Sequence, residues 1–133
     1  ALTADRATPR RDGRRLSLPV AAATKLFAGS IVCVNASNLA VKGAVSTTLK
    51  AAGVAVAQAD NSAGAAGDIR VEVERGLWLM ANSASTDQIA LADIGASCYI
   101  VDDQTVAKTN GSSTRSVAGI VRDVDAAGVW VEF

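Results

Sequence analysis

The sequence predicts a mainly β protein, a small β-barrel or β-sandwich-like domain with an extended N-terminal arm. Its clearest signal is residues 68–74, where apolar and charged residues alternate strictly. Because the side chains of a strand point alternately to its two faces, Ile69, Val71 and Val73 would form a dry face opposite a charged one. A shorter alternation occupies residues 129–133. Clusters of Gly, Asn and Ser separate the apolar runs, as is typical of short strands joined by turns.

Length and composition fit one such domain. The 133 residues are 50% hydrophobic but only 4% aromatic, so we expect a thin core to which burial between copies of the chain would add. The formal net charge is zero, whereas general binders of nucleic acid or anionic membranes are usually basic. No apolar run is long enough for a membrane span. We therefore expect neither a membrane nor direct nucleic acid as a partner.

Residues 1–15 differ in composition from the rest of the chain. Five arginines against two aspartates give them a net charge of +3, and the remainder carries −3. The pattern predicts a flexible basic arm, followed by a single β-rich domain over residues 16–133. The arm is either a solvated tail without a role or a segment that orders on an acidic or strand-edge partner. Its arginines are Arg6, Arg10, Arg11, Arg14 and Arg15.

Further strands are predicted where β-type runs lie between turn residues. Pro19 cannot donate to a ladder, so residues 16–20 suit a strand at the edge of a sheet. Residues 21–27, which are rich in Ala, would form a single helical turn. The remaining strands would cover residues 31–34, 39–41, 53–57, 77–80, 96–101, 105–108, 117–124 and 128–133.

Two segments of the chain resemble each other. A strand opened by Gly53 precedes an Ala- and Gly-containing loop and the alternating strand at residues 68–74. A strand opened by Gly119 likewise precedes a loop with Ala-Gly and the strand at residues 128–133. Two hairpins of similar design would suit a closed or nearly closed barrel, which also protects strand edges.

The alternation breaks at Arg75 and Gly76, which predicts a bulge or bend. If the register continues, Trp78 lies on the charged side of its strand; if a bulge intervenes, Trp78 turns into the core. Trp130 lies on the face opposite Val131. An outward Trp is frequently covered by a partner. The candidate residues for such contacts are Trp78, Trp130, Arg70, Glu72 and Glu74.

We predict no enzyme, and no catalytic, cofactor-binding or metal-binding residues. The chain has no histidine, which removes Ser-His-Asp and Cys-His triads and most zinc sites. Cys33 and Cys98 lie among β-type residues and are expected to be buried reduced thiols, with a disulfide as the alternative. The acidic pairs at 102–103 and at 123 and 125 lie in turn-like sequence, where aspartate caps the backbone.

The order of the β motifs resembles the capsid cement, or head decoration, proteins of tailed phages, especially those of Mu-like phages and prophages. The resemblance covers about residues 16–133. It lies in the segments 18–20, 27–32, 53–55, 68–73 with Gly76 and Trp78, 94–103, 117–121 and 129–131.

This resemblance implies a barrel-like homotrimer on the exterior of the virion capsid, assembled in the cytoplasm of the bacterial host. Such proteins clamp the major capsid protein at three-fold and quasi-three-fold positions against the pressure of packaged DNA. They have no active site or cofactor, and their N-terminal arm often reaches onto the capsid. The five arm arginines would then contact the capsid, and the two tryptophans a subunit or the capsid. The alternative is a small barrel that binds nucleic acid through its basic arm.

Overall fold

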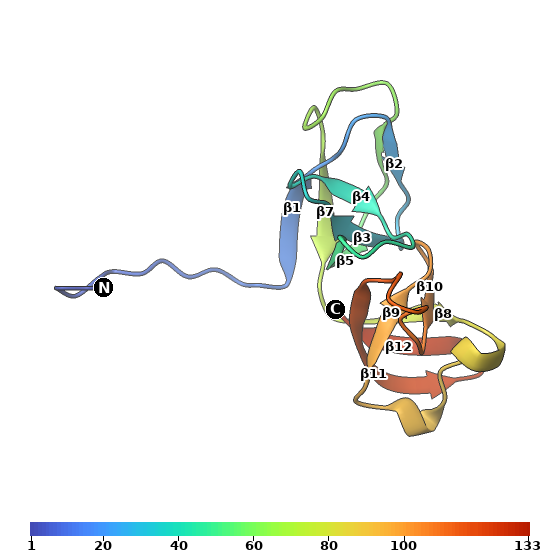
Figure 1. Cartoon of the computed structure of the whole chain (residues 1–133). Coiled ribbons are helices and arrows are strands. Elements are labelled where there is room, and N and C mark those ends of the chain that lie inside the picture. Colours follow the sequence, from blue (N-terminus) through green and yellow to red (C-terminus); the bar gives the residue numbers. More distant parts are fainter.

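The computed structural model describes residues 1–133 and confirms the mainly β fold (Figure 1). Twelve strands and two short 3₁₀ helices, η1 (Ser85–Asp87) and η2 (Leu91–Asp93), follow one another along the chain. The first six strands are β1 (Arg15–Pro19), β2 (Thr24–Leu26), β3 (Ile31–Val34), β4 (Ala40–Lys42), β5 (Lys50–Ala55) and β6 (Ala59–Asn61). The last six are β7 (Arg70–Glu74), β8 (Leu77–Asn82), β9 (Ser97–Ile100), β10 (Thr105–Ala107), β11 (Val117–Asp125) and β12 (Gly128–Glu132).

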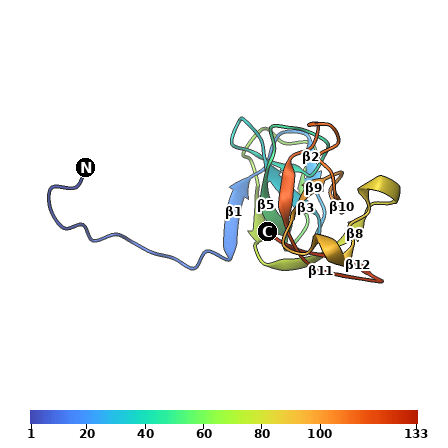
Figure 2. The ribbon, with the colours of Figure 1, turned by 60° about the horizontal axis from the view of Figure 1, so that its bottom comes forward.

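The strands form two lobes. The sheet lobe is a five-stranded sheet in the order β1-β7-β5-β3-β4, next to the two-stranded ribbon β2-β6. The barrel lobe is a closed barrel in the order β10-β8-β12-β11-β9. In Figures 1 and 2 the N-terminal arm leaves the start of β1 and runs away from both lobes. The predicted barrel is therefore present, and an open sheet is joined to it.

Strand β7 has the predicted alternation. Val71 and Val73 are 1% and 0% exposed, whereas Arg70 and Glu72 are exposed. β1 ends at Pro19 and is the outermost strand of the sheet, as its proline predicts. The helical turn expected at residues 21–27 is wrong, because β2 forms there and pairs with β6. A single helical turn is unstable alone, so pairing with a distant strand prevails.

One hydrophobic core joins the two lobes. It contains Met80, Val121 and Val131 of the barrel together with Ile31 and Val54 of the sheet, all at most 3% exposed. A second, smaller core lies within the sheet lobe beneath the ribbon. The shared core fixes the sheet against the barrel, so surfaces on the two lobes keep a constant geometry.

The two similar segments form antiparallel strand pairs in the same register, but only β11–β12 is the predicted hairpin, because β6 lies between β5 and β7 and pairs with β2. Val54 pairs with Glu74 in one, and Ile120 pairs with Glu132 in the other. In each, the preceding glycine lies against the carbonyl of that glutamate. A Cβ on Gly53 would lie 2.6 Å from the Glu74 carbonyl oxygen, and one on Gly119 would lie 2.2 Å from that of Glu132.

The break at Gly76 carries the chain from the sheet to the barrel. Gly76 has φ +146, a conformation that favours glycine, and it separates β7 from β8. Beyond it Trp78 shares the inner face with buried Met80 and packs against the larger core. Trp78 therefore turns into the core, which is the alternative predicted for a bulge at Gly76. Leu77 and Leu79 consequently point outward.

Candidate interaction surface

The acidic pairs act as turn-forming groups. Asp102 Oδ1 accepts the backbone N–H groups of Gln104 at 2.9 Å and Thr105 at 2.7 Å. Asp125 Oδ2 accepts the indole Nε1–H of Trp130 at 2.9 Å, and its Oδ1 accepts the N–H of Ala127 at 2.7 Å. The Trp130 hydrogen bond and these backbone donors lower the pKa of Asp125. The carboxylates are thus held by neighbours in their own turns.

The two thiols are buried and reduced. Cys33 and Cys98 are both free and 0% exposed in the core shared by the lobes, so the disulfide alternative does not hold. Burial raises the pKa of Cys33 to about 12 and that of Cys98 to about 11. A protonated thiol is a poor nucleophile, so neither has the character of a reactive cysteine.

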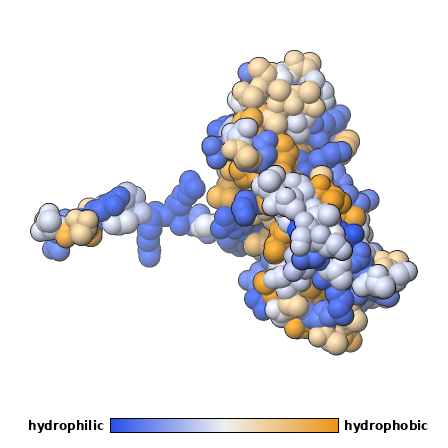
Figure 3. Space-filling view, in the orientation of Figure 1, coloured by the Kyte–Doolittle hydropathy of each residue, from blue (hydrophilic) through white to orange (hydrophobic).

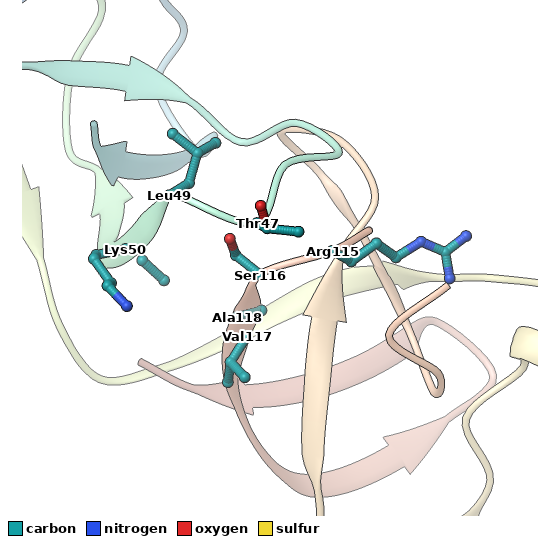
Figure 4. Close-up of a pocket in the computed structure, with 8 residues that line it drawn as sticks. Thr47, Leu49, Lys50, Arg115, Ser116, Val117 and Ala118 are labelled. Atoms are coloured by element: carbon teal, nitrogen blue, oxygen red, sulfur yellow. The ribbon is translucent and has the colours of Figure 1, made fainter. Parts of the chain in front are cut away.

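A hollow of about 450 Å³ lies where the two lobes meet (Figure 4). Lys50 lies on one side of it and Ser116 on the other. The Ser116 hydroxyl donates to the Ser46 carbonyl at 2.6 Å, which ties the lobes together there. The Arg115 guanidinium points away from the hollow in Figure 4 and pairs with Asp87 at 2.9 Å. The hollow thus has one charged side chain and a serine already bonded to the backbone.

Nowhere in the structure do three or more His, Cys, Asp or Glu side chains gather closely enough to hold a metal ion. No helix has the length and apolar character needed to cross a membrane. The features that remain to be explained are the arm, the edge of the sheet and the outer wall of the barrel.

The base of the arm is anchored to the body. Arg14 and Arg15 both pair with Glu74, at 3.0 and 3.2 Å, through its two carboxylate oxygens. The backbone N–H of Arg75 donates to the Arg14 carbonyl at 2.7 Å, which extends the pairing of β1 with β7. Asp12 Oδ1 accepts the N–H of Arg14 at 3.1 Å. These contacts fix the point at which the arm leaves the sheet.

The structure therefore divides the five arm arginines into two groups. Arg14 and Arg15 hold the start of β1, while Arg6, Arg10 and Arg11 are exposed and form no ion pair or hydrogen bond within the chain. Of the other charged candidates, two have partners within the chain and one does not. Glu74 is engaged in the anchor, and Arg70 donates to the Ser17 hydroxyl at 3.0 Å and to its carbonyl. Glu72 is exposed and has no ion pair.

Strand β1 continues the arm directly into the edge of the sheet. It pairs with β7 along residues 15–19 and has no strand on its other side. On that side an added strand could pair with β1, although Pro19 has no N–H to donate and the Ser17 carbonyl already accepts from Arg70. Figure 3 shows the hydrophilic arm leading to an apolar area of the body near β1.

An apolar strip lies on the outer wall of the barrel. We define the barrel strip as Leu77 and Leu79 of β8 and Trp130 of β12. Leu77 is 51% and Leu79 is 41% exposed. In the ladder Trp130 lies between Leu79 and Asp123. Sequence reasoning found Trp130 but missed both leucines, because they lie beyond the break at Gly76. The sequence did contain a signal for them: residues 77–80 are all apolar, so a strand there must place apolar side chains on both of its faces.

Comparison of the chain with family models, with curated proteins and with solved structures gives no match. The function must therefore be inferred from these surfaces and from the order of the sequence motifs.

Proposed function

We propose that this chain is a capsid decoration, or cement, protein: a structural component of a phage head that carries out no catalysis. A homotrimer would bind the outer surface of the major capsid protein shell and stabilise the head against internal DNA pressure. The observation that carries the proposal is the exposed basic arm, anchored at its base and continuous with an open sheet edge.

The arm has the properties of a clamp that orders on binding. Arg6, Arg10 and Arg11 have no partner in their own chain, so their charges are available to acidic groups on another protein. An extended arm loses conformational entropy when it orders, and backbone pairing along the edge of β1 would offset that loss. A cement protein needs such reach, because it must join neighbouring capsid subunits.

The barrel strip supports the oligomeric part of the proposal. Leu77, Leu79 and Trp130 form apolar surface on a domain whose core is built mainly from small residues. Burial of such surface between copies would supplement the thin core. A trimer also presents three arms at once, and simultaneous binding raises the apparent affinity of each.

The test uses empty heads assembled from the major capsid protein of the phage or prophage that encodes this chain. Full-length protein should co-sediment with these heads and raise the temperature at which they break. A variant lacking residues 1–11 should bind more weakly, while Arg14 and Arg15 still anchor β1 to Glu74. Lys42→Ala, on β4 and outside both the arm and the barrel strip, is the control for loss of an exposed positive charge.

The outcomes separate the parts of the proposal. If the full-length protein does not bind heads, the cement function is refuted. If the shortened variant binds equally well, only the role of the arm is refuted. A short DNA fragment shifted by the full-length protein, with the shift abolished by moderate salt, would instead favour nucleic-acid binding through the arm.

A further inference from the structure

The barrel strip is an apolar surface with an acidic rim. The carboxylates of Asp123 and Asp125 lie beside Trp130 in the β11–β12 hairpin, and Asp125 accepts the indole N–H. Glu132 lies opposite Leu77 in the ladder and pairs with Arg122. Three carboxylates against one guanidinium leave the rim with a net charge of −2. The surface therefore suits a ligand that is extended, partly apolar and basic.

One segment of this chain has that chemistry. Residues 6–11 read Arg-Ala-Thr-Pro-Arg-Arg, with a net charge of +3 and no acidic residue. They are all exposed and have no hydrogen bond or ion pair in the structure. Proline favours an extended conformation that packs on aromatic rings, and arginine both stacks on tryptophan and pairs with carboxylates. The segment thus complements the strip in shape, polarity and sign of charge.

We propose that, in the protein not bound to a head, residues 6–11 of one copy dock on the barrel strip of another copy, so that the arms link the subunits of the oligomer until the capsid competes for them. In this arrangement Pro9 packs against Trp130, and the flanking arginines pair with Asp123 and Asp125. That three subunits are linked in this way rests on the trimer of the proposed function. The contact between arm and strip does not itself depend on capsid binding.

The geometry of the arm favours a neighbour over its own chain. Arg14 and Arg15 are tied to Glu74, and from that point the arm runs outward from the body in both views (Figures 1 and 2). The eight residues from Arg6 to Gly13 reach roughly 26 Å when extended, enough to reach the surface of an adjacent, contacting domain. The arm of one copy and the strip of the next are different surfaces, so the contact is head-to-tail. Head-to-tail contacts produce a closed ring when the rotations between successive copies add up to a full turn.

Crosslinking between two variants tests the contact directly. Ala7→Cys places a thiol in the arm and Leu79→Cys places one in the strip, in separate preparations. The native Cys33 and Cys98 are 0% exposed and contribute little background. After mixing and mild oxidation without heads, we expect a disulfide-linked pair of chains that contains one of each variant. Ala7→Cys mixed with Val45→Cys is the control, since Val45 is 54% exposed but lies outside the strip.

Self-association provides a second, independent measurement. Sedimentation velocity of Arg6→Ala/Arg10→Ala/Arg11→Ala, whose changes lie outside the folded domain, should show association weakened by roughly tenfold, the effect of losing several partly exposed charge pairs. Leu79→Glu should weaken it as well, and Val45→Glu should not.

Several results would overturn the proposal. One is crosslinking of the strip variant no stronger than that of the Val45→Cys control. Another is a crosslink that forms only within single chains carrying both Ala7→Cys and Leu79→Cys, which would make the occupant the chain's own arm. Association unchanged by the triple arginine variant would also contradict it. Head binding is measured separately, so a full-length protein that binds heads but gives no arm-to-strip crosslink would overturn this inference and leave the cement function intact.

Discussion

Replacement of Gly119 by alanine tests the close approach of a glycine to a glutamate carbonyl on the paired strand, a feature of both lobes. Gly119 lies on β11, opposite the end of β12. A Cβ there would lie 2.2 Å from the carbonyl oxygen of Glu132 and 2.9 Å from Cγ1 of Val131. The first of these atoms belongs to the backbone of a paired strand, so it cannot rotate away. The hairpin must separate locally to admit one methyl group.

The loss in free energy of unfolding of Gly119→Ala should lie at the upper end of the range for overpacked sites. Inserting a methyl group into a packed site costs about 1–3 kcal/mol. We expect about 3 kcal/mol here, because the obstacle is a backbone carbonyl in a ladder. For a domain of this length, roughly 3–5 °C of Tm is lost per kcal/mol, so Tm should fall by roughly 10 °C.

Urea and thermal unfolding followed by circular dichroism would measure the effect, with two glycine variants as controls. Gly13→Ala meets nothing within 4 Å and has no positive φ, so its stability should equal that of the parent. Gly95→Ala also meets nothing within 4 Å but has φ +88, so it should lose about 1–2 kcal/mol from backbone strain alone. If Gly119→Ala unfolds at the same urea concentration as Gly13→Ala, the hairpin packing described here is wrong.

Three further predictions concern the anchor, the thiols and the Trp130 hydrogen bond. Glu74→Gln removes the shared partner of Arg14 and Arg15, whose side chains are 72% and 65% exposed, so the stability loss should be below about 1 kcal/mol. Trypsin should nevertheless cut after these two arginines faster than in the parent protein, which mass spectrometry of the digest would show. Cys33 and Cys98 should resist a thiol reagent until the protein unfolds. Burial raises their pKa from 9.0 to about 12 and about 11. The part of the unfolding free energy that depends on their being protonated is therefore fully present below pH 9 and should be lost as the pH rises toward the folded values. Urea midpoints that stay constant from pH 8 to 11 would contradict this. The pKa of Asp125 is lowered below 3.8, so its contribution to stability is present above pH 3.8 and lost as the pH falls through the lower folded value; tryptophan emission should change in that range, and Asp125→Asn should abolish the change.

Local features of the sequence predict much of this fold, because strands and turns leave short-range patterns. The alternation of residues 68–74 identified the buried face of β7, and Pro19 identified an edge strand. The pairing of the strands could not be predicted in the same way. β1 pairs with β7 across more than fifty residues, and β10 pairs with β8 in parallel to close the barrel. Such contacts depend on packing of the whole chain rather than on any local period.

The candidate surface was predicted less completely than the fold. The basic arm is evident from composition alone, but its division is not. Arg14 and Arg15 differ from Arg10 and Arg11 only because Glu74 lies across the ladder from Arg15, a pairing fixed by the register of β1 with β7. Sequence reasoning therefore assigned all five arginines to one role, whereas the structure gives two of them a role within the chain.

The break between β7 and β8 explains why the strip was missed. The side-chain period of a strand is two, so a slip of one residue exchanges its faces. Gly76 introduces that slip, which turns Trp78 inward and exposes Leu77 and Leu79, while β12 keeps its phase and Trp130 stays outside. The strip therefore exists because one strand is re-phased and its partner is not.

The same short segment also determines where the arm leaves the body. Glu74 binds Arg14 and Arg15, and the Arg75 N–H binds the Arg14 carbonyl, immediately before Gly76 redirects the chain into the barrel. Residues 74–77 thus fix the base of the arm, the crossing between the lobes and the first residue of the strip. A change in this segment would alter both surfaces at once. Separate tests of the two surfaces therefore require substitutions on either side of it, in the arm at residues 6–11 and on the barrel at Leu79.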